Sequence, residues 1–175
     1  HTVAGGMGGH FGEGIQMCWE VGAAEEGMRY YDPTIEQVEG EAIDTPVHRA
    51  AREPYLYVNK FAKRFSDESH YKILYQPDGM YYSLFDADMA ALMESEPTIK
   101  TTVYTPSHNN PIEGLANALE EAVAAGRVYK ANSIEELAEA AGLDAPTLAA
   151  TVQEYNDAVD AGEDWWFNKD VAHMH

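Results

Sequence analysis

The segment from 131 to 169 constrains the fold of this chain most, because it carries the start and stop signals of two helices. An S-x-x-E capping box begins at Ser133, and Gly142 is typical of a helix C-terminus. Asp144 is a suitable N-cap for the next helix, which Gly162 is expected to end. The spacing therefore predicts two consecutive helices joined by a short turn.

Apolar residues recur at helical spacing inside both helices, so each helix is expected to bury one face. A third helix of the same kind is predicted from 111 to 126. The stripes expected to face the core are Ile134, Leu137, Ala138 and Ala141, then Leu148, Val152, Tyr155 and Val159, and in the third helix Ile112, Leu115, Ala116, Leu119 and Val123.

Strand signals occur mainly in the first half of the chain. The run YLYVNKFAKRF at 55–65 predicts a hairpin, and strands are also expected at 80–85 and 100–104. Asp86 is a suitable N-cap for a helix that continues through Met93. Because strands precede helices rather than alternating with them, the fold class is predicted to be α+β.

The N-terminal part is expected to contain one helix, from 13 to 24, followed by an irregular linker at 29–47. The single cysteine, Cys18, excludes a disulfide within the chain and is expected to be a buried apolar residue. It would share the apolar face of the helix with Ile15, Trp19 and Gly22.

The net charge of −19 argues against nucleic acid and against anionic membrane surfaces as partners. No apolar run is long enough to predict a membrane span. His173 and His175 are close in sequence, but no H-E-x-x-H or C-x-x-C spacing occurs, so no functional metal site is predicted.

Two stretches permit both a structural and a functional interpretation. The glycine-rich start, 5–14, lacks a G-x-G-x-x-G pattern and is either a terminal loop or a set of backbone donors for an anion. The stretch 55–68 places aromatic rings beside cationic groups, which suits a small anionic or planar substrate. It equally suits a packed apolar face with a solvated charged one.

Three phrases together resemble the fumarate reductase/succinate dehydrogenase flavoprotein family, and they occur in that family's order. They are GHFGEGIQMCWEVGAA at 9–24, YLYVNKFAKRFSDES at 55–69 and KANSIEELAEAAGLDAPTLAATVQEYNDAVDAGEDWWFNK at 130–169. The resemblance implies the substrate-capping domain of an FAD-dependent enzyme. Residues 1–45 would be an edge of the FAD-binding domain and a linker, 46–160 the cap, and 161–175 a return linker.

The resemblance also assigns candidate site residues. Glu68 would lie near the substrate and a proton path, and Gly12, Glu13 and Gly14 would lie near the flavin. Lys72, with His70 beside it, would contact the substrate.

The family's proton-donating arginine has no counterpart here, because Ala90 occupies the matching position. This departure argues against fumarate as the substrate, since a dicarboxylate would lose a proton donor and a charge partner. A tyrosine is expected to replace the arginine as catalytic group, and the candidates are Tyr71, Tyr81 and Tyr82.

The implied function is the reduction or formation of an activated C=C bond by a larger flavoenzyme, of which this chain would be an inactive piece. FAD would be bound mainly by other parts of that enzyme. The implied partners are a small unsaturated substrate, the remainder of the FAD domain, and a haem- or quinol-linked electron donor. The compartment stays open between cytoplasm and cell envelope. The alternative is a free-standing acidic binding module without catalytic activity.

Overall fold

The computed structural model describes residues 13–24, 45–69, 80–98 and 110–174, and the chain divides into two units, 1–42 and 43–175. The described part of the first unit is helix α1 (Glu13–Glu20). The elements of the second unit are α2 (Pro46–Ala51), β1 (Leu56–Asn59), β2 (Tyr81–Leu84), α3 (Ala87–Ser95), α4 (Leu115–Ala124), α5 (Ile134–Ala141), α6 (Ala145–Ala161) and the 3-10 turn η1 (Val171–His173). The predicted α+β class is confirmed.

Helix α1 differs from its prediction, because every side chain in it is exposed. Cys18 is exposed as well, so the expectation of a buried cysteine is wrong. Ile15 and Trp19, expected on a buried face, are 46% and 43% exposed. The physical reason is that an apolar helix face is buried only by a second packed layer, and the described part of this unit has none.

The two strands form an antiparallel sheet in which Leu56 lies opposite Leu84 and Asn59 opposite Tyr81. The strand predicted at 80–85 is therefore confirmed, but the hairpin predicted within 55–65 is wrong. After β1 the chain turns tightly: the amide of Asn59 donates to the carbonyl of Lys63 at 3.0 Å, and Ala62 has a φ of 56°. The residues after this turn form no strand, and β1 pairs with β2 instead.

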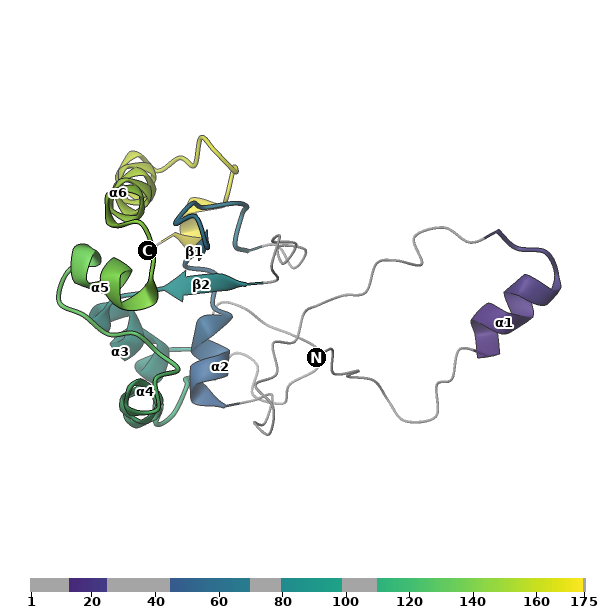
Figure 1. The fold of residues 1–175 in the computed structure, drawn as a ribbon, viewed down its shortest axis with the longest axis horizontal. Coiled ribbons are helices and arrows are strands. Elements are labelled where there is room, and N and C mark those ends of the chain that lie inside the picture. Colours follow the sequence, from purple (N-terminus) through teal and green to yellow (C-terminus); the bar gives the residue numbers. More distant parts are fainter. Residues whose placement is uncertain (1–12, 25–44, 70–79, 99–109, 175) are drawn as a thin grey trace. The chain divides into compact units, whose positions relative to one another are not determined.

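One face of the sheet packs against α5 and α6. Leu56, Val58, Tyr82 and Leu84 face these helices, as strand alternation requires. Their main partners in this first core are Ala138, Leu148, Tyr155, Ala158 and Met174. A second core joins α2, α3 and α4 through Ala50, Tyr55, Met93, Ile112 and Leu115. In Figure 1 the strands lie between α6 and the group formed by α2, α3 and α4.

The predicted helix caps are present. The hydroxyl of Ser133 accepts from the amide of Glu136 at 3.1 Å, and the carboxylate of Asp144 accepts from the amide of Thr147 at 3.0 Å. Gly142 and Gly162 end α5 and α6 with φ near 70°, the left-handed conformation that glycine adopts without strain. Asp86 caps α3 as predicted, because its carboxylate accepts from the amide of Met89 at 2.8 Å.

The predicted bounds of one helix and of one linker need correction. Helix α4 begins at Leu115, not at 111, because Gly114 is left-handed and the amide of Ile112 donates to Met93 at 2.7 Å instead. The linker predicted at 29–47 ends before α2, which starts at Pro46 with Thr45 as its N-cap. The strand predicted at 100–104 lies outside the described residues.

Candidate functional site

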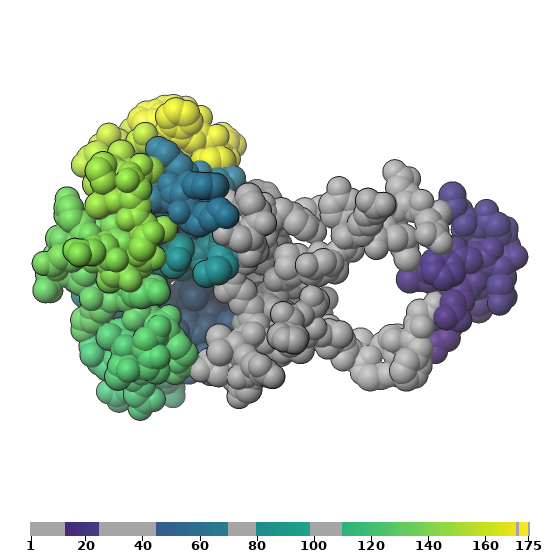
Figure 2. All heavy atoms as spheres, in the orientation of Figure 1, coloured from purple at the N-terminus to yellow at the C-terminus, as the bar shows by residue number. Residues whose placement is uncertain are grey.

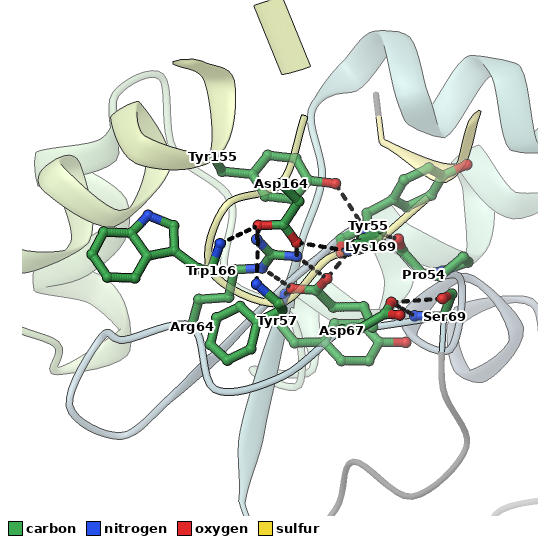
Figure 3. Close-up of polar contacts among 12 residues, drawn as sticks. Pro54, Tyr55, Tyr57, Arg64, Asp67, Ser69, Tyr155, Asp164, Trp166 and Lys169 are labelled. Atoms are coloured by element: carbon green, nitrogen blue, oxygen red, sulfur yellow. Dashed lines mark hydrogen bonds and ion pairs between the residues drawn. The ribbon is translucent and has the colours of Figure 1, made fainter. Parts of the chain in front are cut away.

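Arg64 is the centre of a buried polar cluster in the second unit (Figure 3). It follows the turn after β1, and its side chain is 8% exposed. Its Nε and Nη2 donate to the two carboxylate oxygens of Glu68 at 2.7 and 2.8 Å. Its Nη1 and Nη2 donate to the two oxygens of Asp164 at 2.9 and 2.8 Å. One guanidinium therefore makes two bidentate ion pairs, a geometry that only arginine offers.

Lys169 completes the cluster with a fully buried ammonium group. Its Nζ donates to the carbonyl of Pro54, to the carbonyl of Tyr55 at 3.1 Å and to the hydroxyl of Tyr155 at 3.0 Å. It also lies 3.2 Å from a carboxylate oxygen of Glu68. The cluster contains two cations and two anions, so its charges balance in the protein interior.

Asp164 organises the turn that follows α6. Its carboxylate accepts from the amides of Trp166, Phe167 and Lys169 at 3.2, 3.3 and 3.1 Å, in addition to its pair with Arg64. The side chain of Asp164 is fully buried. A buried carboxylate needs such a set of donors to compensate for its lost hydration.

Aromatic rings enclose the cations. The guanidinium of Arg64 lies 5.1 Å from the ring centre of Tyr155 and 4.9 Å from that of Phe167. Lys169 Nζ lies 5.1 Å from the same tyrosine ring. These are cation–π distances, and the contribution of such contacts grows when water is excluded.

The surroundings shift the pKa of three charged groups. Burial alone would lower the pKa of Arg64, but its hydrogen bonds to Glu68 and Asp164 raise it above the ordinary value. Burial would raise the pKa of Asp164, yet the Arg64 guanidinium and the donated amides lower it on balance. Burial lowers the pKa of Lys169, with the attraction of Glu68 opposing the shift.

The second notable feature is an aromatic face on the side of the sheet away from α5 and α6. The rings of Tyr57 and Tyr81 are 4.9 Å apart at their centres, and the ring of Phe65 lies 6.3 Å from Tyr81 in an edge-on arrangement. Burial and then the neighbouring Tyr81 raise the pKa of Tyr57 well above its ordinary value. The Tyr57 phenol therefore keeps its proton at neutral pH.

The structure separates two of the predicted catalytic tyrosines. Tyr81 belongs to the aromatic face with Tyr57, whereas Tyr82 packs against the core formed with α5 and α6. Consecutive residues of a strand point to opposite sides of a sheet, so the two phenols cannot serve one site together. The third candidate, Tyr71, lies outside the described residues, as do His70, Lys72 and Gly12.

Glu68, predicted to lie near the substrate, is fully buried in the cluster, and both of its oxygens bind Arg64. One of these oxygens also lies 3.4 Å from the amide nitrogen of Tyr57. In this arrangement Glu68 joins segments of the protein. Its predicted role beside a substrate is not tested by these contacts and stays a prediction.

Glu13 and Gly14, the described residues predicted to lie near a flavin, lie in the first turn of α1, and both are exposed. A Cβ placed on Gly14 would meet no heavy atom within 4 Å. The predicted position of Glu13 and Gly14 near a flavin is not tested by this geometry and stays a prediction. These residues do not enclose a site by themselves.

Sequence reasoning singled out Glu68 and missed its partners Arg64, Asp164 and Lys169 as a cluster. A signal was present, because K-R-F-x-x-E and D-x-x-F-x-K place charges at fixed spacings between apolar residues. Nothing in the spacing indicates that the two phrases meet in space.

The described residues contain neither a group of side chains arranged for a metal ion nor a helix suited to crossing a membrane. Within residues 13–24, 45–69, 80–98 and 110–174, no group of three or more His, Cys, Asp or Glu side chains is arranged to hold a metal ion. None of the helices in these ranges has the length and apolar character that a membrane crossing requires.

The chain is similar to two bacterial reductases, and no protein-family model matches it. It is 28% identical over 160 residues to the NADH:acrylate oxidoreductase of Vibrio harveyi. The aligned region covers 90% of this chain and 14% of that protein. It is 25% identical over 179 residues to the vinyl phenol reductase of Lactiplantibacillus plantarum. The aligned region covers 93% of this chain and 36% of that protein. The chain thus spans about a seventh and about a third of the lengths of these relatives.

Proposed function

We propose that the chain is part of an FAD-dependent oxidoreductase that acts on an activated C=C bond, and that its second unit is the substrate-capping part. The observation that carries the proposal is the similarity along 90% or more of the chain to two reductases from different bacteria. Acrylate and vinyl phenol, the compounds in their names, both contain a C=C bond next to a conjugating group. We propose that such a bond is what the parent protein of this chain acts on.

FAD, bound mainly by the rest of the parent protein, would supply hydride transfer to an alkene carbon, or in the reverse direction accept hydride from the corresponding saturated carbon. The chain's own residues would exclude water and hold the proton needed at the neighbouring carbon. Among the described residues we propose Tyr81 for this proton; its ring lies beside Tyr57 on the aromatic face. Arg64 and Lys169 already have buried anionic partners, which makes them poor candidates for binding a substrate carboxylate.

The test uses the full-length parent protein. We expect a bound flavin, visible in the absorption spectrum, whose dye-reduced form is reoxidised anaerobically by conjugated alkenes. The panel should contain acrylate, vinyl phenol and fumarate, and fumarate is expected to react more slowly than the best acceptor because Ala90 replaces the arginine. A colourless protein, or a flavin that no alkene in a broad panel reoxidises, would overturn the proposal.

The tyrosines offer a sharper comparison within that enzyme. Tyr81→Phe should slow flavin reoxidation by the alkene, because the proton donor is lost while the ring remains. Tyr82→Phe is the matched control, because its ring packs in the core on the other side of the sheet. Equal rates for the wild type and Tyr81→Phe would exclude Tyr81 as the proton donor and leave Tyr71 as the candidate.

A further inference from the structure

The turn at 163–170 owes its order to polar contacts. Its two tryptophans, Trp165 and Trp166, are 58% and 67% exposed and so bury little apolar area. In Figure 3 the indole of Trp166 points away from the charged cluster. The backbone is held instead by the carboxylate of Asp164, which accepts three amide hydrogens, and by the buried ammonium group of Lys169.

These contacts connect distant parts of the chain. The pairs of Arg64 with Asp164 span 100 residues, and the bonds from Lys169 to the carbonyls of Pro54 and Tyr55 span 115 and 114. Figure 2 shows the yellow C-terminal segment against the blue segment that contains these earlier residues. The turn after α6 is therefore fastened to the residues that lead into β1.

None of the four charged residues belongs to the apolar core, although Tyr155, which accepts a hydrogen bond from Lys169, is a member of that core. The core between the sheet and helices α5 and α6 consists of other residues, among them Val58, Leu148 and Ala158. Met174 is 4% exposed in the same core and anchors the chain beyond the turn, while α6 anchors it before. Between these two anchors the charged cluster is the principal support of the turn.

We propose that Arg64, Glu68, Asp164 and Lys169 form a clasp that orders residues 164–169 against the entry to β1 and that opens locally, without unfolding the helices. Arg64 is its central member, because it alone pairs with both carboxylates. This inference does not depend on the proposed function. It assigns the cluster a conformational role, in which opening of the clasp frees one turn and leaves the two cores closed.

Hydrogen exchange of the 175-residue chain tests the clasp, with Arg64→Met as the main variant. The reporting amides are those of Trp166, Phe167 and Lys169, which donate to Asp164. Loss of Arg64 leaves two carboxylates facing one ammonium group, so we expect these amides to exchange roughly 10²–10³-fold faster, the scale set by breaking a buried pair. The three turn amides should exchange through a smaller opening than the amides in the centres of α5 and α6, which a weaker dependence of their exchange on low concentrations of urea would show.

A fluorescence measurement gives an independent readout. The chain has three tryptophans, so in a Trp19→Phe background the emission comes from Trp165 and Trp166. Arg64→Met should add a fast component to their anisotropy decay with no loss of helical circular dichroism. Lys130→Met, which removes the cation of an exposed pair with Glu120, is the matched control and should change neither signal.

Two results would overturn the clasp. One is unchanged exchange of the three turn amides in Arg64→Met, which would mean that the turn is ordered without Arg64. The other is a urea dependence of exchange that is as steep for the three turn amides as for amides in α5 and α6, which would mean that the turn opens only when the whole unit unfolds. If Arg64→Met does not fold, Arg64→Lys decides between these outcomes, because it keeps the charge and loses both bidentate pairs.

Discussion

Lys169 illustrates how the second unit accommodates charge in its interior. Its ammonium group has partners in three separate stretches of the chain, namely residues 54–55, Glu68 and Tyr155. Burying an unpaired ammonium group would be far more costly than the small net stability of a domain permits. The cation is tolerated only because the carboxylate, the carbonyls and the hydroxyl are all in place.

Replacing Lys169 should therefore lower the free energy of unfolding. Lys169→Met keeps the length of the side chain but leaves Glu68 with one cation fewer, and we expect a loss of about 3–5 kcal/mol in the free energy of unfolding. Urea denaturation of the 175-residue chain measures it. Lys130→Met, in the exposed pair with Glu120, should lose less than about 1 kcal/mol. Equal losses in the two variants would contradict the structural account of the cluster.

The pH dependence of stability gives a second test at the residue scale. The pKa of Asp164 lies below its ordinary value of 3.8, so the folded protein holds this proton less tightly than the unfolded chain. Its contribution to stability is therefore complete above pH 3.8 and is lost as the pH falls through the folded pKa.

Asp164→Asn should remove this contribution. The variant should be less stable than the wild type at pH 7, and the difference should narrow as the pH falls below 3.8. Unfolding by urea at a series of pH values checks this. A difference between Asp164→Asn and the wild type that stays constant with pH would refute the assignment.

At the scale of elements, the sheet decides which residues share a surface. Tyr57 and Tyr81 lie on one face, and Val58 and Tyr82 lie on the other. The two strands are short, and the sheet depends on α5 and α6 to cover its apolar side. The strand alternation therefore places the neighbouring tyrosines Tyr81 and Tyr82 in different environments.

This division predicts different consequences for stability. Tyr82→Ala removes a ring that packs on the first core and should destabilise the chain by about 1–3 kcal/mol, less than for a fully buried aromatic ring. Tyr129→Ala, at a position that is 45% exposed, should have little effect. Thermal unfolding followed by circular dichroism measures both. A Tyr82→Ala variant as stable as the wild type would show that the ring does not support the sheet.

At the scale of the whole molecule, both cores lie inside the second unit. Their members run from Ala50 to Met174, so the cores that the described residues form lie within residues 43–175. A chain that begins at 43 should keep cooperative thermal unfolding, because a domain that contains its own core can fold alone. Loss of the cooperative transition in that truncated chain would mean that the first unit is required for folding.

The sequence by itself determined the local structure of the second half. The caps at Ser133, Asp144 and Asp86 and the glycine ends of α5 and α6 depend on bonds between residues three to five positions apart. Such contacts form wherever the right residues occur at the right spacing. For the same reason α2 could have been found from its Thr45-Pro46 start.

Only the tertiary structure decided which distant segments meet. Strand β1 pairs with β2, not with the residues after its own turn, because the turn directs Arg64 toward Asp164, 100 residues further on. The spacing of charges in two phrases gave no indication that they form one cluster. Which long-range contacts form depends on the balance of burial, ion pairing and chain entropy over the whole unit. Local spacing in the sequence does not contain that balance, so it could not predict these contacts.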